Sequence, residues 1–213
     1  MKYFIFLASI LLFSSCSKEA LEFSCNPEVD SWVKQNKETY AGISRTRLAT
    51  EIDFDRQRAL FVSFSPEQKV NIYQQKYQYL MELKSLSQEE KVYLTKLFQH
   101  VKPEIYSSES SNREFTAFAD EWTNEVQNVL GWTELDVFRY THTWFTNEEF
   151  EEWINYKQKS STLKSTGEEP PCECYYSISC VWGFFELCED GGCTINYNCG
   201  ISSTSKCTGL CKR

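Results

Sequence analysis

The segment that decides the fold class is residues 65–80, SPEQKVNIYQQKYQYL. Ser65 stands where a helix N-cap is expected, Pro66 takes the first helical position, and Gln68 takes the third. The apolar side chains that follow share one face of a helix; they are Ile72, Tyr73, Tyr77 and Leu80. The segment therefore predicts an amphipathic helix that begins with a capping box.

The same kind of start signal occurs on both sides of this segment. Each start is a Ser, Thr or Asn that precedes an apolar run of helical period. The predicted starts are Asn26-Pro27-Glu28, Ser87 with Glu90, Ser111 with Glu114, Thr133 with Asp136 and Thr146 with Glu149, with a shorter helix over residues 45–52. Stops are predicted at Pro103, which cannot continue a helix, and at Gly131, which suits a helix C-terminus.

Residues 27–158 are therefore expected to form an all-α domain. Pro and Gly are scarce there, and no segment alternates apolar and polar residues as a half-buried strand does. We expect six or seven helices in an irregular bundle. About 130 residues are enough to enclose one hydrophobic core.

Residues 1–15 resemble the signal peptide of an exported lipoprotein. Lys2 supplies a positive charge, and an apolar run over residues 3–13 is too short to span a bilayer of about 30 Å. Small residues then lead into Cys16, as in a bacterial lipobox, where this cysteine is acylated and becomes the mature N-terminus. The alternative is an ordinary secretory signal with an incidental cysteine.

The lipobox predicts a membrane partner, reached through the lipid on Cys16 and a tether over residues 16–26. An acidic residue directly after the lipidated cysteine would favour retention in the inner membrane, but Ser17 and Lys18 are not acidic. We therefore expect an outer-membrane lipoprotein of the bacterial cell envelope, facing either the periplasm or the surface. The formal net charge of −8 makes nucleic acid an unsuitable partner, because phosphate binding needs a basic surface.

The composition changes after the helical domain. Residues 159–171 are rich in Ser, Thr, Glu and Pro and predict a linker. Residues 172–213 predict a small disulfide-rich module with short β-strands on either side of a turn at residues 189–192. Its expected disulfide-forming cysteines are Cys172, Cys174, Cys180, Cys188, Cys193, Cys199, Cys207 and Cys211.

Four bridges among these eight cysteines would stabilise a tail that is too short to be held by hydrophobic burial alone. The competing interpretations are a zinc site and a catalytic thiol. Both are disfavoured because the tail has no histidine and no Cys-x-x-Cys pair. Eight cysteines allow 105 pairings, so the connectivity stays open.

Cys25 is the cysteine without an evident partner once Cys16 is acylated and the tail cysteines pair among themselves. The favoured interpretation is burial as a small apolar residue at the edge of the helical domain. A free thiol, an intermolecular bridge and a bridge into the tail remain as alternatives.

Aromatic residues gather early in the tail, and they have two interpretations. Exposed, they would contact a target or a membrane interface; buried, they would form a small core around the disulfides. The residues proposed for contact are Tyr175, Tyr176, Trp182, Phe184 and Phe185.

No catalytic, metal-binding or cofactor-binding constellation is apparent. His100 and His142 are far apart in the sequence and belong to no His-Glu-x-x-His motif, so we interpret them as surface or helix-end residues. The run of glutamates at residues 148–152 is typical of a solvated helix face. We therefore expect a non-enzymatic protein without a cofactor.

The layout resembles the bacteriocin fulvocin C-related proteins, exported lipoprotein-like chains of bacteria related to Bacteroides and Flavobacterium. The likeness covers most of the mature chain. It is carried by the lipobox at Cys16, Ser24-Cys25-Asn26-Pro27-Glu28 with Trp32-Val33, residues 64–69, Gly131-Trp132-Thr133 and the Cys172-Glu173-Cys174 opening of the tail. Later cysteine spacings differ, so no connectivity is transferred. The resemblance implies an antibacterial role.

Two functions are therefore expected. In the first, the helical domain displays a bacteriocin-like tail to a bacterial surface target. In the second, the helical domain binds a partner and the tail is a structural cap.

Overall fold

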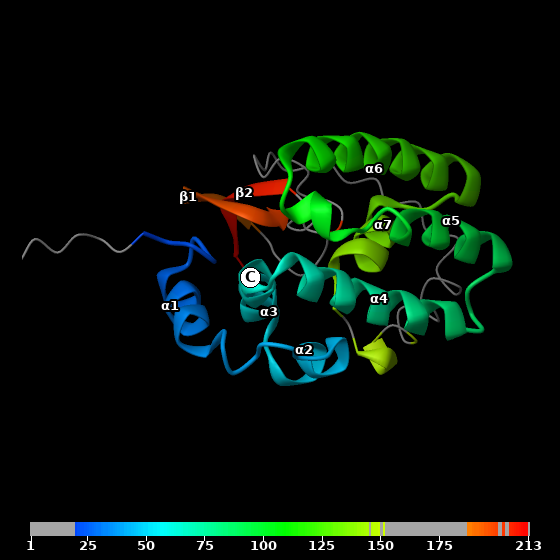
Figure 1. Ribbon diagram of the computed structural model, residues 1–213. Coiled ribbons are helices and arrows are strands. Elements are labelled where there is room, and N and C mark those ends of the chain that lie inside the picture. Colours follow the sequence, from blue (N-terminus) through cyan, green and yellow to red (C-terminus); the bar gives the residue numbers. More distant parts are fainter. Residues whose placement is uncertain are drawn as a thin grey trace, which may run out of the picture.

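In this computed structural model, four of the eight described helices begin at side-chain caps that the sequence predicts, namely Asn26, Ser65, Ser87 and Thr133. The structure describes residues 20–144, 146–149, 151, 187–199, 202 and 205–212. Their elements are α1 (Pro27–Asn36), α2 (Arg45–Glu51), α3 (Phe54–Ser63), α4 (Pro66–Glu82), α5 (Gln88–Phe98), the 3-10 helix η1 (Pro103–Tyr106), α6 (Glu109–Leu130), α7 (Glu134–His142), β1 (Leu187–Cys199) and β2 (Ser205–Lys212). The helical character of the N-terminal domain is confirmed (Figure 1).

The predicted caps form reciprocal hydrogen bonds. In the box that opens α4, the Gln68 N–H donates to Ser65 Oγ over 3.2 Å, and the Ser65 N–H donates to Gln68 Oε1 over 2.9 Å. The same reciprocal pairs occur at Ser87 with Glu90, Thr133 with Asp136 and Thr146 with Glu149. Each cap satisfies backbone donors that have no partner inside the helix.

Two of the predicted helix limits are wrong. Helix α6 begins at Glu109, because Ser108 and not Ser111 is its N-cap and accepts the Ser111 N–H over 3.4 Å. The earlier start gives the helix further backbone hydrogen bonds. Pro103 does not end α5, which stops at Phe98; it opens η1, where its fixed φ suits a first helical position.

Helix α3 was not predicted from the sequence. Asp53 caps it by accepting the Arg56 N–H over 3.1 Å, but the third helical position lacks the Glu or Gln that would complete a capping box. The helix supplies buried Ala59, Leu60 and Phe61 to the core. The formation of this helix therefore depends on tertiary packing more than on a local sequence signal.

Aromatic side chains make up the centre of the domain. Phe61 packs against Tyr73 with ring centroids 5.6 Å apart and against Trp144 at 5.0 Å, so α3, α4 and the end of α7 meet there. Trp122 of α6 is fully buried, and its indole N–H donates to the Tyr93 carbonyl over 2.8 Å. These contacts form one hydrophobic core that extends from α1 to α7.

Gly131 ends α6 as predicted. Its φ of 65° lies in the left-handed region, which favours glycine because a Cβ there would be strained. The following Trp132 N–H reaches back to the Val126 carbonyl over 3.3 Å. The turn directs Trp132 into the core, where it is 3 % exposed.

The tail strands β1 and β2 pair as an antiparallel hairpin, but the predicted turn at residues 189–192 is wrong. Strand β1 continues through this segment, and the register between the strands shifts between Asp190 and Ile195. A Gly-Gly pair is accommodated at such an irregularity as readily as in a turn. The connection instead lies between Cys199 and Ser205.

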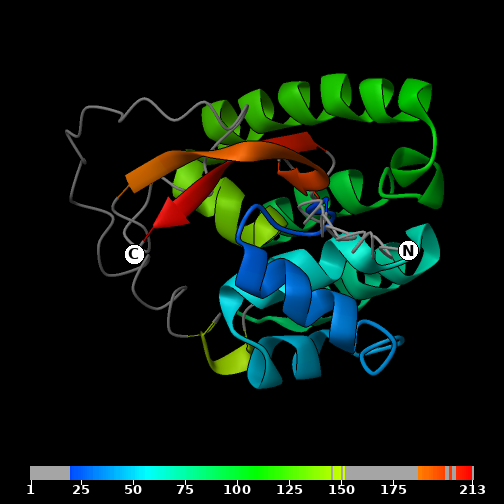
Figure 2. The same ribbon diagram turned by 90° about the vertical axis from the view of Figure 1, so that its left-hand side faces the viewer.

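The hairpin lies against the helical domain. Its β1 backbone approaches α3, and both views place the hairpin on one face of the molecule between α1 and α6 (Figures 1 and 2). The chain therefore joins its helical and cysteine-rich parts by direct packing as well as through the predicted linker.

Candidate functional site

The predicted site residues divide between described and undescribed parts of the chain. The residues outside the described part are Cys16, Cys172, Cys174, Cys180, Tyr175, Tyr176, Trp182, Phe184 and Phe185, together with the whole predicted linker. Five cysteines lie on the hairpin: Cys188, Cys193 and Cys199 on β1, and Cys207 and Cys211 on β2. Cys188 and Cys211 occupy opposite positions of the register.

Cys25 is both buried and disulfide-bonded. Cys25 is 7 % exposed, so the predicted burial is confirmed, and its sulfur is part of a disulfide, which excludes the alternative of a free thiol. The sequence could not decide this, since cysteine burial and cysteine pairing favour the same apolar surroundings. The structure thus favours a covalent role for Cys25.

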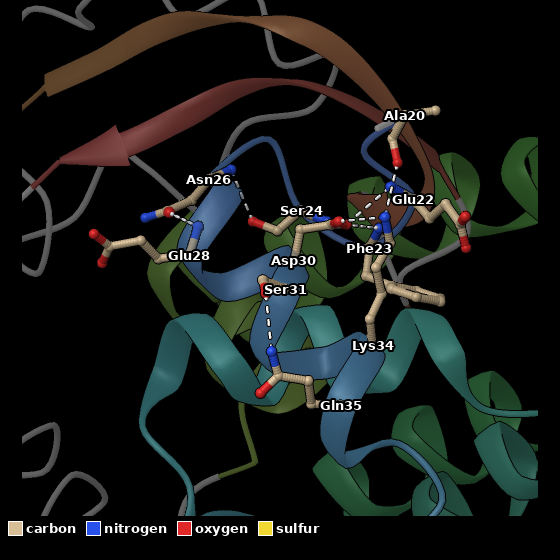
Figure 3. A network of polar contacts seen from close by, with 10 residues as sticks. All are labelled: Ala20, Glu22, Phe23, Ser24, Asn26, Glu28, Asp30, Ser31, Lys34 and Gln35. Carbon is tan, nitrogen blue, oxygen red and sulfur yellow. Dashed lines mark hydrogen bonds and ion pairs between the residues drawn. The ribbon is translucent and has the colours of Figure 1, made fainter. Parts of the chain in front are cut away.

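Asp30 holds the segment that carries Cys25. One carboxylate oxygen, Oδ1, accepts the N–H groups of Glu22 at 2.8 Å, Phe23 at 2.7 Å and Ser24 at 3.3 Å (Figure 3). The other oxygen lies 3.1 Å from the Lys34 ammonium. We call residues 20–25, held in this way, the N-terminal clasp.

Lys34 closes the clasp from the other side. Its Nζ donates to the Ala20 carbonyl over 3.0 Å while it pairs with Asp30 one helical turn earlier (Figure 3). Phe23 then lies in the core at 9 % exposure. The packed structure therefore begins within residues 16–26, which the sequence assigned to a tether.

The Asp30 carboxylate is stabilised in its charged form. Burial raises its pKa, but the N–H groups of Phe23 and Glu22 and the Lys34 ammonium together lower it below the ordinary value of 3.8. Asp30 is 2 % exposed, and its carboxylate is occupied by three backbone N–H groups and the Lys34 ammonium. We infer that Asp30 positions the chain before α1.

The other end of the hairpin is docked by a buried hydrogen bond. The Tyr106 hydroxyl donates to the Ser202 carbonyl over 2.9 Å, and Ser202 is 1 % exposed. Burial raises the pKa of Tyr106 well above its usual range, so the hydroxyl stays protonated as a donor. Ser202 has a positive φ of 55°, which is uncommon for a residue with a side chain.

Helix α4 places two buried lysines against the ends of other helices. Lys69 Nζ donates to the Val62 carbonyl in the last turn of α3 over 3.1 Å. Lys76 Nζ donates to the Thr143 carbonyl over 2.7 Å and the Arg139 carbonyl over 3.2 Å, at the end of α7. Positive groups at a helix C-terminus bind carbonyls that have no partner within the helix.

Both lysines have perturbed electrostatics. Burial lowers the pKa of Lys69 to about 8, and burial with Arg45 nearby lowers the pKa of Lys76 well below its ordinary value. Such shifts also occur in catalytic lysines. Here Lys76 is 0 % exposed and Lys69 is 4 % exposed, so neither side chain is open to a substrate.

The sequence carries a signal for these residues that belongs to no motif. Lys76 follows Tyr73 by three positions and precedes Leu80 by four, so it lies on the apolar face of the predicted helix. Asp30 likewise precedes Val33 by three positions on the buried face of α1. A charge on a core-facing position indicates a buried polar partner.

The histidines lie at helix ends, as predicted. His100 follows the end of α5 and stacks on Phe118 with ring centroids 3.8 Å apart. His142 is the last residue of α7, and its Nδ1 lies 2.5 Å from Thr141 Oγ1. Among the described side chains, no group of three His, Cys, Asp or Glu residues is placed to hold a metal ion.

Within the described segments, no helix is both long enough and apolar enough to cross a bilayer. The chain matches no known protein-family model, no curated protein and no solved structure. The described part of the chain is a helical domain with a β-hairpin docked on it and with its N-terminal segment held by the clasp.

Proposed function

We propose that this protein is a non-enzymatic, envelope-anchored lipoprotein whose helical domain binds a partner and whose cysteine-rich tail is a structural cap. The observation that carries the proposal is the docking of the hairpin, through the buried bond between Tyr106 and Ser202. A tail that packs on its own domain is suited to covering that domain. A displayed toxin module would need fewer such contacts.

The membrane attachment rests on the lipobox at Cys16. The N-terminal clasp supports it, because a chain that is pulled at its end needs a firm connection to its domain. Only residues 16–19 then separate the proposed lipid from the clasp. Four residues reach at most about 14 Å, so the domain would lie close to the membrane.

The contact surface of the helical domain is proposed at α5 and α6. Val92 and Val129 are the large apolar side chains most exposed in the described part, at 58 % and 55 %. Lys96, four residues after Val92, pairs with Glu125, four residues before Val129, over 2.5 Å. Apolar side chains beside charged ones are typical of the edge of a protein–protein interface.

The second candidate is display of the tail as a bacteriocin-like module against a bacterial surface target. It is favoured by the Cys172-Glu173-Cys174 opening and by the neighbouring aromatic residues. In that case target binding would depend on residues of the tail. In the first case it would depend on the face of α5 and α6.

Binding of the full oxidised protein to envelope fractions separates the two functions. One variant replaces Val92 and Val129 with serine, and the other replaces Trp182, Phe184 and Phe185 with serine. Loss of binding in the first variant alone supports recognition by the helical domain. Loss in the second alone, together with growth inhibition of related bacteria by the native protein, refutes it in favour of display.

The anchor has its own test. Cells that express the full chain are fed an alkyne-bearing fatty acid, and incorporation is compared with a Cys16→Ser variant. Label on the native chain and none on the variant supports acylation. An unlabelled native chain would overturn the lipoprotein assignment.

A further inference from the structure

We propose that Cys25 is bridged to a cysteine of the β1–β2 hairpin, so that the two ends of the chain are closed into one covalent unit. The sulfur of Cys25 is already known to be in a disulfide. Nine other cysteines could supply its partner. The surroundings of Cys25 favour the hairpin.

The place of Cys25 in the fold favours this bridge. The clasp lies beside the hairpin: both strands run past the segment that contains Ser24 and Asn26, the two neighbours of Cys25 (Figures 2 and 3). Cys25 is buried in this region. A disulfide requires Cα atoms within about 7 Å, so its partner has to come from a segment that packs here.

Hydrogen bonds hold the segments on both sides of the proposed bridge. Asp30 fixes the three residues before Cys25, and the Asn26 N–H donates to Ser24 Oγ over 3.1 Å. On the other side, Tyr106 holds Ser202 at the connection between the strands. Two positioned segments lose little conformational freedom when a bond forms between them.

The number of cysteines on the hairpin also favours a bridge to Cys25. There are five, an odd number, so they cannot all pair with one another. Cys188 lies opposite Cys211, a register position at which a cross-strand bridge is geometrically accessible. The remaining three are Cys193, Cys199 and Cys207, and Cys25 supplies the fourth.

The bond forms by thiol–disulfide exchange. The Cys25 thiol and the hairpin thiol each lose a proton, and the two electrons pass to a disulfide of a donor oxidoreductase of the envelope, which becomes a dithiol. The new bond joins the two sulfurs. The two protons and two electrons lost by these thiols are taken up by the oxidoreductase disulfide, which becomes two thiols.

One consequence rests on the proposed acylation of Cys16. The acylated chain keeps nine cysteines, so one cannot form an intrachain bridge. If Cys25 and the five hairpin cysteines form three bridges, the cysteine left over is one of Cys172, Cys174 and Cys180. The thiol available to an external partner would then lie in the tail and not at Cys25.

Peptide mapping of the full mature protein tests the bridge. The protein is purified without reductant, alkylated under denaturing conditions and digested with trypsin and a glutamate-specific protease. Cys25 then lies in the fragment 23–28, away from Cys16. The hairpin cysteines fall in fragments 187–189, 190–206 and 207–212. Cys172 lies in a fragment that ends at Glu173, and fragment 174–186 contains both Cys174 and Cys180.

Recovery of fragment 23–28 joined to a hairpin fragment is the expected result. A bridge to fragment 174–186 or to Cys172 would overturn the inference and leave the lipoprotein assignment untouched. A bridge to Cys16 would overturn both, because an acylated sulfur cannot form a disulfide. Alkylated Cys25 would overturn the inference alone.

A second measurement does not depend on mapping. Limited trypsin cuts at Lys164, in the predicted linker, and the products are run on a denaturing gel without reductant. The native chain is expected to stay as one band until reductant is added, whereas Cys25→Ser releases the tail directly. A Glu121→Gln control, at an exposed position of α6 away from the bridge, behaves as the native chain. Release of the tail from the unreduced native chain contradicts the bridge.

Discussion

The N-terminal clasp should contribute a large share of the stability of the domain. Asp30→Ala removes the acceptor of three backbone N–H groups, of which those of Glu22 and Phe23 lie within 2.8 Å. A hydrogen bond to a charged group contributes about 1.5–3 kcal/mol, and an unsatisfied buried donor costs about 1–3 kcal/mol. The substitution should therefore lower the free energy of unfolding by about 3–4 kcal/mol.

The assay is urea unfolding of the oxidised protein, followed by the fluorescence of buried tryptophans such as Trp122. With a urea slope of about 2 kcal/mol per M, the expected loss moves the midpoint down by about 1.5–2 M. Asp30→Asn keeps the size of the side chain and one carbonyl oxygen, and should lose about half as much. Glu121→Gln, on an exposed position of α6, is the matched control and should change little.

The pH dependence of the same variants tests the electrostatic part. The pKa of Asp30 is lowered in the folded state, so its charge stabilises the fold above the unfolded pKa of about 3.9, and this contribution is lost as the pH falls through the folded pKa. The difference between the native protein and Asp30→Asn should therefore shrink on acidification. A midpoint shift below about 0.3 M for Asp30→Ala, or a difference that grows with acidity, would refute the argument.

Three further predictions concern other parts of the fold. The pKa of Lys69 is about 8 in the folded chain and about 10.5 in the unfolded chain, so the unfolded chain binds more protons between these values. The free energy of unfolding should therefore rise by up to about 1.4 kcal/mol per pH unit from pH 8 to 9.5. Lys69→Met should abolish this rise in thermal unfolding. Tyr106→Phe should leave the Ser202 carbonyl without its donor, cost about 1–2 kcal/mol and speed amide exchange in the hairpin, as measured by mass spectrometry. Gly131→Ala should cost about 1 kcal/mol in urea unfolding, because its φ is 65° and no neighbour of the added Cβ compensates for the strain.

The helices were predictable from the sequence where a side chain caps them. Ser65, Ser87 and Thr133 each precede an acid or amide at the third helical position, a local pattern that acts before tertiary contacts form. Helix α3 lacks this pattern after Asp53 and was missed. Local capping patterns thus predict where these helices start, whereas α3, which lacks a complete capping box, depends on packing.

The site was less predictable, because its contacts join residues far apart in the chain. Tyr106 reaches Ser202, 96 residues later, and Lys76 reaches Thr143, 67 residues later. No spacing rule within one element indicates such pairs. The disulfide of Cys25 was left open for the same reason, since a cysteine shows its own position and not that of its partner.

The N-terminal clasp also determines how the domain would respond to force. A pull on the N-terminus first loads the bond between the Ala20 carbonyl and Lys34, and then the N–H groups of Glu22, Phe23 and Ser24 on Asp30, one after another. The next restraint along the chain is the disulfide at Cys25, a covalent bond that is far stronger than the hydrogen bonds before it. Tension would therefore unfasten residues 20–24 and stop at Cys25, before it reached the first turn of α1.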